Sequence, residues 1–137
     1  MDEDCPFCGI AAGEEPAHEV YRDDDVVAFL DRSPAVESHT LVAPTAHREE
    51  LTDMTPDAVG RLFRVVRQVG GAIESAYDPD GLSVIQSSGA AAGQDVFHVH
   101  VHLFPRYDED DITLAPARYP LSEGEGERVA GALRDAL

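Results

Sequence analysis

The chain has 137 residues, which suits a single domain over residues 1–137 and leaves little room for a second. Its 27 acidic and 10 basic residues give a formal net charge of -17, and this argues against nucleic acid as a partner because phosphate binding needs a basic surface. No stretch approaches the ~20 apolar residues that cross a bilayer, and the acidic start does not fit a signal peptide, so we expect a soluble cytoplasmic protein.

The first part of the chain opens with a cysteine pair and continues with short strands. Cys5 and Cys8 have a spacing that, in a reducing cytosol, indicates a metal site or a redox pair. Three aspartates at residues 23–25 form a predicted turn, so the strands on either side of it are expected to pair as a hairpin. The strands predicted in this part cover residues 20–22, 26–31 and 40–43.

One long helix is predicted in the middle of the chain. Thr55 offers a capping hydroxyl, Pro56 suits the first helical position, and Asp57 places an acid in the first turn. Apolar residues then recur at helical spacing. This pattern predicts a helix over residues 56–77, which a Pro- and Gly-containing turn ends.

Two more strands and a last helix complete the predicted elements. The strands cover residues 82–86 and 96–104. Ser122 and Glu125 have the spacing of a capping box, which favours a helix over residues 122–137, although three glycines weaken it. Because strands and helices do not alternate regularly, we expect an α+β domain with a mostly antiparallel five-stranded sheet, one long helix and a shorter C-terminal helix.

The most informative segment is residues 98–104, which read HVHVHLF. Successive side chains of a strand point to opposite faces, so His98, His100 and His102 are expected to form a row of imidazoles roughly 7 Å apart. The apolar residues between them can then pack on a helix. A neutral imidazole is a nucleophile, so one ring can attack phosphorus while a neighbour assists the leaving group or holds a phosphate oxygen.

Other interpretations of this segment stay open. The histidines can be surface residues of an edge strand, or they can share a metal, although alternate strand residues are splayed too widely for three to bind one ion easily. The small residues at positions 87–93 favour a phosphate-binding loop because their backbone can approach a ligand closely, and Gln94 adds a side-chain donor. An ordinary hairpin loop is the alternative.

These residues resemble the histidine triad (HIT) family, whose motif is His-φ-His-φ-His-φ-φ with φ apolar, and residues 98–104 match it at every position. Further matches occur in the expected order along residues 5–106, whereas the acidic extension at residues 107–137 lies outside the resemblance. The matching segments are Cys5-Pro6-Phe7-Cys8, Phe29-Leu30-Asp31, residues 38–42, Pro44 with His47, residues 92–94, and Pro105-Arg106.

The resemblance implies an assembly and residue roles. The family folds as an antiparallel sheet with helices and generally works as a homodimer. His100 is similar to the nucleophile that takes the α-phosphate, His102 to the group that contacts phosphate and assists the leaving group, and His39 to a hydrogen-bonding partner of the triad.

The resemblance also implies a substrate site. Asp31 is similar to the carboxylate that accepts from both ribose hydroxyls. Phe7, Ile10 and Phe29 would line the base pocket. Plain core packing is the alternative for each of them. The residues implied to bind substrate are Asp31, Gln94, Gly93, Phe7, Ile10 and Phe29.

The cysteine pair resembles a feature of the Hint-like branch of the family. Cys5, Cys8, His47 and His98 are similar to its zinc ligands, and two thiolates with two imidazoles satisfy tetrahedral Zn²⁺ without an open position, as expected of a structural site. Two reduced buried thiols beside a surface His47 are the alternative.

By resemblance, the expected activity is hydrolysis of nucleoside 5′-phosphoramidates or related nucleoside monophosphate derivatives, through a nucleotidyl-histidine intermediate and without a catalytic metal. A dinucleoside polyphosphate hydrolase is one alternative, and a nucleotide-binding or scaffold protein with little turnover is another. A zinc-only structural module is a third. Two residues depart from the family pattern: Asp95 replaces a small hydroxyl residue near phosphate, and Ser87 replaces an amide side chain.

The charge adds an expectation about the protein's surroundings. All ten basic residues are arginines, and the apolar content of 43% argues against a disordered acidic chain. At about 1 M salt the Debye length is roughly 3 Å, so the self-repulsion of the chain would be screened. We therefore expect a halophilic source and a protein that loses structure as salt is removed.

Overall fold

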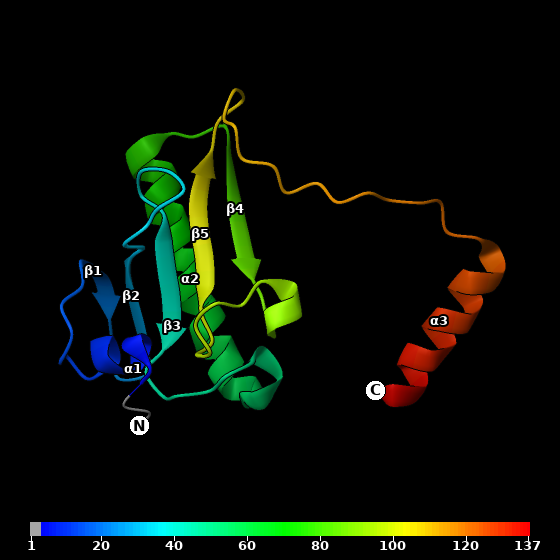
Figure 1. Cartoon of the computed structure of the whole chain (residues 1–137), viewed down its shortest axis with the longest axis horizontal. Coiled ribbons are helices and arrows are strands. Elements are labelled where there is room, and N and C mark those ends of the chain that lie inside the picture. Colours follow the sequence, from blue (N-terminus) through cyan, green and yellow to red (C-terminus); the bar gives the residue numbers. More distant parts are fainter. Residues whose placement is uncertain (1–3) are drawn as a thin grey trace.

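The computed structural model describes residues 4–137 and contains one antiparallel sheet with a long helix against one face (Figure 1). The five strands have the order β1-β2-β3-β5-β4, so β5 lies inside the sheet and β4 forms one edge. The predicted α+β architecture is confirmed. The elements are α1 (Pro6–Ala11), β1 (Glu19–Arg22), β2 (Val26–Leu30), β3 (Thr40–Pro44), α2 (Pro56–Tyr77), β4 (Gly81–Gln86), β5 (Val101–Arg106) and α3 (Glu123–Ala136), with short 3-10 turns at Leu51–Asp53 and Ala90–Ala92.

The long helix α2 has the bounds that the sequence predicts. The Thr55 hydroxyl accepts from the backbone N–H of Ala58 at 3.2 Å, and Pro56 occupies the first turn. The helix ends where Asp78 adopts a left-handed conformation with φ 46°. Among the described residues, none of the helices has the length and apolarity that a membrane crossing requires.

The sheet separates two apolar clusters, which explains why nearly every residue of β2 and β3 is buried. Residues Val99, Val101 and Leu103 pack toward α2, as predicted. On the opposite face, α1 contributes Phe7 and Cys8 to a smaller cluster. That cluster is completed by Cys5, Val27, Phe29 and Leu41.

The predicted strand over residues 96–104 is wrong at both ends. β5 begins at Val101 and continues to Arg106. The chain before it bends, and the N–H of Val99 donates to the carbonyl oxygen of Arg48 at 2.7 Å instead of to a neighbouring strand. Only His102 of the three histidines therefore lies in a strand. The helix α1 is a second difference, since the sequence analysis expected no helix over residues 6–11.

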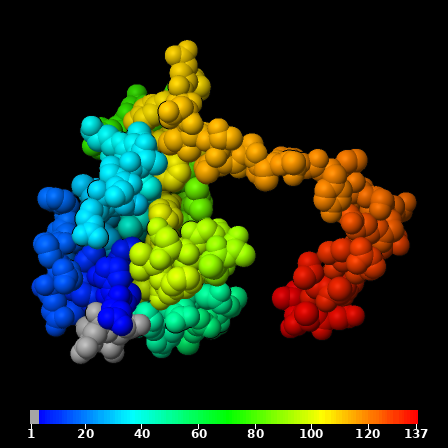
Figure 2. Space-filling view, in the orientation of Figure 1, coloured from blue at the N-terminus to red at the C-terminus, as the bar shows by residue number. Residues whose placement is uncertain are grey.

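The C-terminal segment leaves the domain as an extended chain and ends in α3 (Figure 1). The Nε and Nη2 atoms of Arg106 donate to the two carboxylate oxygens of Asp110 at 2.8 and 3.0 Å, which fixes the turn where the chain leaves β5. The predicted cap is confirmed, because the Ser122 hydroxyl accepts from the N–H of Glu125 at 3.2 Å. α3 stands apart from the domain, with open space between them (Figure 2).

Candidate active site

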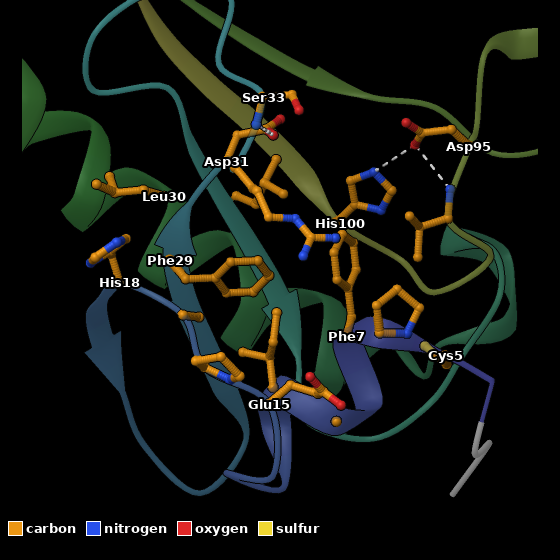
Figure 3. Close-up of a pocket in the computed structure, with 18 of the residues that line it drawn as sticks. Cys5, Phe7, Glu15, His18, Phe29, Leu30, Asp31, Ser33, Asp95 and His100 are labelled. Atoms are coloured by element: carbon orange, nitrogen blue, oxygen red, sulfur yellow. Dashed lines mark hydrogen bonds and ion pairs between the residues drawn. The ribbon is translucent and has the colours of Figure 1, made fainter.

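A cleft of about 1300 Å³ lies between α1, the end of β2 and the segment that precedes β5 (Figure 3). Its lining includes side chains of α1 and β2 and two rings of the histidine motif, and one of these rings, His100, packs against Phe7 of α1. The residues predicted from sequence that line this cleft are Phe7, Ile10, Phe29, Asp31, His100 and His102, with Asp95 at its edge. The structure therefore brings together residues from three separate parts of the chain.

The three histidines do not form the even row that was expected. The ring centroids of His100 and His102 are 5.0 Å apart, shorter than the spacing of about 7 Å expected for alternate strand residues. His98 points away from the cleft toward the cysteine pair and is fully buried. The bend before β5 causes this division, so the motif serves two different sites.

The tautomer of His100 follows from a backbone contact. Its Nδ1 lies 2.7 Å from the carbonyl oxygen of His98, which can only accept, so Nδ1 carries the proton. Nε2 then holds a free lone pair in the cleft, 3.7 Å from Oδ1 of Asp95. His100 is 4% exposed, and Phe7 packs edge-on against it with ring centroids 4.9 Å apart. The ring is therefore fixed with its nucleophilic atom facing the cleft.

A second chain of contacts fixes the tautomers of His39 and His102. The N–H of Ala35 donates to Nδ1 of His39 at 2.9 Å, so His39 carries its proton on Nε2. That Nε2 lies 2.9 Å from Nδ1 of His102 and donates to it. His102 must then carry its own proton on Nε2. The result is an N–H donor next to the nucleophilic nitrogen of His100.

Burial favours the neutral form of the His39 and His102 rings. It lowers the pKa of His39, which the carboxylate of Asp31 partly opposes, and it lowers the pKa of His102, helped by the neighbouring imidazoles. Asp31, His39 and His102 lie close enough together to suggest a metal site. The N–H of His39 already points at His102, however, and leaves no lone pair for an ion there.

The aromatic residues expected at a base pocket are part of the core and also reach the cleft. Phe7 and Phe29 are 8% and 2% exposed, and their rings meet edge-on with centroids 5.3 Å apart. They belong to the core cluster under α1 and also line the cleft. Asp31 follows directly after β2 and accepts from the N–H of Ser33 at 2.9 Å through one carboxylate oxygen. Its other oxygen, Oδ2, lies 3.5 Å from Nε2 of His39.

The phosphate loop differs from the expectation. The side-chain oxygen of Gln94 accepts from the N–H of Gly89 at 2.7 Å, and its amide nitrogen donates to the carbonyl oxygens of Glu49 and Val96. Gln94 therefore holds the loop together and does not line the cleft. Gly93, with φ 99°, serves the same turn and also lies outside the lining.

The cleft contains charged residues that the sequence pattern did not single out. Besides Asp31 and Asp95, which the sequence analysis named, its lining includes the acids Asp4, Glu14 and Glu15, with Arg32 as the one arginine among the lining residues that the structure describes. Arg32 adjoins Asp31 in the sequence, which is the signal that could have found it. The charged side chains that line the cleft with His100 and His102 are thus predominantly acidic.

The four residues predicted as metal ligands come together beneath α1. The Nδ1 atoms of His47 and His98 are 3.3 Å apart, and each lies 3.2 to 3.5 Å from a cysteine sulfur. Tetrahedral Zn²⁺, with bonds of about 2.3 Å to sulfur and about 2.0 Å to nitrogen, sets N–N edges of about 3.3 Å and S–N edges of about 3.5 Å. The donor atoms therefore have the spacing of a zinc tetrahedron.

The orientation of His98 supports the same chemistry. Its Nε2 donates to the carbonyl oxygen of Pro44 at 2.8 Å, which leaves Nδ1 as a lone pair directed at the sulfurs. Burial lowers the pKa of His98 and raises the pKa of the Cys5 thiol. A cation among them would offset the burial of a thiolate, so the donor set fits a metal better than it fits bare thiols.

Comparison with known proteins gives a family and several relatives. The family model described as "HIT domain" matches residues 12–109. Protein hit from Bacillus subtilis is 41% identical over 109 residues, which cover 80% of this chain and 75% of that protein. The adenylylsulfatase HINT3 of Arabidopsis thaliana is 36% identical over 110 residues, which cover 80% of this chain and 56% of that protein.

Solved structures share the fold. A HIT family protein from Bacillus anthracis superposes with a TM-score of 0.92 at 33% identity, covering 100% of this chain and 99% of its own. A HIT family member from Bacillus subtilis gives 0.93 at 34% identity, with 98% of both chains covered. A Zn-bound histidine triad family protein from Mycobacterium smegmatis gives 0.76 at 34% identity, with 97% and 96% covered.

Proposed function

This chain belongs to the HIT domain family, and on that premise we propose that it hydrolyses nucleoside 5′-phosphoramidates or related nucleoside monophosphate derivatives through a nucleotidyl intermediate on His100. The observation that carries the proposal is the lone pair of His100 Nε2, which a backbone carbonyl holds toward the cleft. The adenylylsulfatase relative supports hydrolysis at a nucleotide phosphorus, because sulfate is there the leaving group of an adenylyl donor.

The first step forms a bond between Nε2 of His100 and the α-phosphorus and breaks the bond from phosphorus to the leaving atom. The Nε2–H of His102 hydrogen-bonds to that atom as negative charge develops, and the leaving amine departs with a proton from solvent. The phosphorylated ring keeps its Nδ1 proton and is therefore cationic. The carbonyl oxygen of His98, at 2.7 Å from Nδ1, stabilises that charge.

The second step returns the enzyme to its resting state. Water attacks phosphorus, the bond to His100 breaks, and the nucleoside monophosphate leaves while the ring regains its lone pair. During both steps Asp31 is positioned to accept from the ribose hydroxyls, and Phe7 and Phe29 flank the base. The roles of His39 and His102 are to hold one N–H donor at the reacting phosphate.

The charge of the cleft favours an uncharged or cationic leaving group. Asp95 lies 3.7 Å from the attacking nitrogen, and the other acids of the lining outnumber Arg32. A polyphosphate leaving group would bring several negative charges into this surrounding, whereas an amine brings none. The phosphoramidate class therefore suits the site better than a dinucleoside polyphosphate does.

We propose that Cys5, Cys8, His47 and His98 hold a structural zinc ion. Their donor spacing and the Zn-bound relative from Mycobacterium smegmatis support this. The ion would complete a closed coordination shell and would take no part in the chemical steps. It would pin α1, and with it Phe7, against the segment that carries His100.

Intact-mass measurement tests the proposed function. The protein in molar KCl is mixed with an adenosine phosphoramidate and quenched in alkali, where phosphohistidine survives. We expect an added adenylyl group that peptide mapping places on His100 and that His100→Ala lacks, while Glu109→Ala, altered outside the cleft, retains it. Tight nucleotide binding by the wild type with neither adduct nor turnover would favour the scaffold alternative.

A further inference from the structure

The hydrolytic step needs a proton acceptor, and the two histidines at the reacting phosphate cannot provide one. In the proposed intermediate, phosphorus occupies Nε2 of His100, while Nδ1 keeps its proton on the carbonyl oxygen of His98. His102 presents an N–H to the cleft, and its Nδ1 already accepts from His39. Water that attacks phosphorus must therefore lose its proton to another group.

Two further groups close to these histidines are already engaged. His39 accepts from the N–H of Ala35 through Nδ1 and donates from Nε2 to His102. Asp31 accepts from the N–H of Ser33 through Oδ1, and its Oδ2 lies 3.5 Å from Nε2 of His39. The proposed function also assigns Asp31 to the ribose hydroxyls. Neither residue is left free to take a proton from water.

Asp95 is the acid that lies beside the reacting nitrogen. Among the described residues, it is the one acid within ion-pair distance of His100, with Oδ1 3.7 Å from Nε2 (Figure 3). Its charge also acts on His102: burial lowers the pKa of that ring, and the Asp95 carboxylate partly opposes this effect. The carboxylate is therefore close enough to act on both rings that face the bound phosphate.

The Asp95 carboxylate has one free oxygen and room to move. Its Oδ1 accepts from the N–H of Val96 at 2.9 Å, whereas no hydrogen bond reaches Oδ2 from the part of the chain that the structure describes. The side chain is 80% exposed. Oδ2 is therefore free to accept from water, and the side chain can turn as phosphate enters beside it.

Two other proton acceptors of the cleft lie at a distance from the reacting ring. Figure 3 shows Glu15 beyond Phe7, beside α1, and it shows His18 on the side of the cleft opposite to Asp95. The Cγ atom of Glu15 lies so close to Gly9 of α1 that a Cβ built on this glycine would be 2.6 Å away. Neither group is placed to take a proton from water at phosphorus.

We propose that Asp95 is the general base of the hydrolytic step, an assignment that rests on the proposed function. Incoming and leaving groups at phosphorus are roughly in line, so water takes the side that the first leaving group vacated. Oδ2 of Asp95 takes a proton from the water as its oxygen bonds to phosphorus. The bond from phosphorus to Nε2 of His100 breaks, and its electron pair returns to the ring. The exposed carboxyl group then gives its proton to solvent.

A base and a merely repulsive charge at Asp95 have opposite effects on the decay of the nucleotidyl adduct. Removing a carboxylate that only repels anions would leave the decay unchanged or make it faster. Removing a general base slows the decay by about 100-fold or more. The variant Asp95→Asn separates the two, because its amide oxygen can still accept from Val96 but takes up no proton.

A single-turnover experiment measures both steps. Protein in excess is mixed with an adenosine phosphoramidate in molar KCl and quenched in alkali at intervals, so that intact mass records the rise and the fall of the adduct. We expect Asp95→Asn to form the adduct at least as fast as the wild type and to lose it about 100-fold more slowly. Asp111→Asn, which alters an exposed aspartate outside the cleft lining, is the matched control and should behave as the wild type.

Chemical rescue adds a measurement that a structural role of Asp95 would not affect. In Asp95→Ala, potassium formate that replaces KCl at equal molarity supplies a small carboxylate, and we expect it to speed the decay about tenfold or more, with no effect on the wild type. Equal decay in the wild type and Asp95→Asn, or no effect of formate on Asp95→Ala, would overturn the base and leave the proposed function standing. No adduct on any of these proteins would overturn both.

Discussion

The Nδ1 atom of His100 lies 2.7 Å from the carbonyl oxygen of His98, and the Nδ1 atom of His98 lies 3.4 Å from the sulfur of Cys5. One residue thus joins the proposed nucleophile to the proposed zinc ligands. His98 contributes its ring to one site and its backbone to the other. The histidine motif therefore couples the proposed zinc ligands to the proposed nucleophile through a single residue, His98.

Metal removal is the first prediction that follows. We expect about one zinc per chain by elemental analysis, and its loss in His47→Ala with a fall in melting temperature of about 10 °C or more, because the coordination energy contributes to folding. The control is His18→Ala, which removes an imidazole outside the cluster and should keep the metal. Wild-type protein that binds no zinc from a metal-buffered solution would refute the assignment.

The second prediction concerns the relay between His39 and His102. We expect His39→Ala to lower kcat by about 10- to 100-fold with little change in KM, because His102 loses the donor that fixes its tautomer. His39→Gln can accept from Ala35 and still donate to His102, so it should recover part of the rate. Equal kcat values for the two variants would argue against a positioning role.

The third prediction concerns stability against pH. Burial lowers the pKa of His39 and His102 in the folded protein, so the unfolded chain binds more protons once the pH falls below about 6.5. The free energy of unfolding should be highest above pH 6.5 and fall between pH 6.5 and 5. In this range carboxylates with lowered pKa, such as Asp110, stay ionised in both states.

Denaturant titration at constant molar KCl checks this pH dependence. His39→Gln removes one of the two groups, so its unfolding free energy should decline less steeply over the same range. A wild-type stability that rises as the pH is lowered would contradict the sign derived from burial.

The fourth prediction concerns the choice of leaving group. We expect Asp95→Ser to raise kcat/KM for a dinucleoside polyphosphate about 10-fold relative to a phosphoramidate, because the carboxylate 3.7 Å from the attacking nitrogen no longer repels a polyanion. Competition between the two substrates in one reaction measures the ratio directly. Glu109→Gln, which removes an acid outside the cleft, is the control, and a change of the same size there would indicate a general charge effect.

The fifth prediction concerns salt. With a net charge of -17, the folded chain repels itself in dilute buffer, so the melting temperature should rise by about 10 °C or more from 0.1 to 2 M KCl. Sucrose at matched osmolality separates screening from preferential exclusion and should give a smaller rise. A melting temperature independent of KCl would contradict the expectation of a salt-adapted protein.

The sequence predicts those elements best whose boundaries depend on local chemistry. α2 was predicted to the residue because Thr55 and Pro56 specify its start and a turn containing Pro and Gly specifies its end. α1 was missed because it has only six residues and its capping atom is the sulfur of Cys5, which accepts from the N–H of Cys8 at 3.3 Å. Cysteine is not among the residues that usually mark a helix start.

Residues that hydrogen-bond to the main chain of a distant segment could not be placed from the sequence alone. The alternation around His98 suggested a continuous strand, but the contact of Val99 with Arg48 bends the chain before β5. Gln94 seemed available for substrate because nothing local reveals the carbonyl of Glu49 to which it donates at 2.6 Å. The four expected metal ligands and most of the expected substrate residues still came together, because the family motif encodes their arrangement in three dimensions.

The contacts of Phe7 link the proposed nucleotide site to the proposed zinc site. Its ring contacts both the proposed metal cluster and the proposed nucleophile, with centroids 6.0 Å from His98 and 4.9 Å from His100. Any nucleotide that rests its base on Phe7 must favour the position of α1 that also keeps Cys5 and Cys8 in place. If both proposed ligands bind, thermodynamic reciprocity requires that the nucleotide raise the affinity for zinc by the same factor by which zinc raises the affinity for the nucleotide.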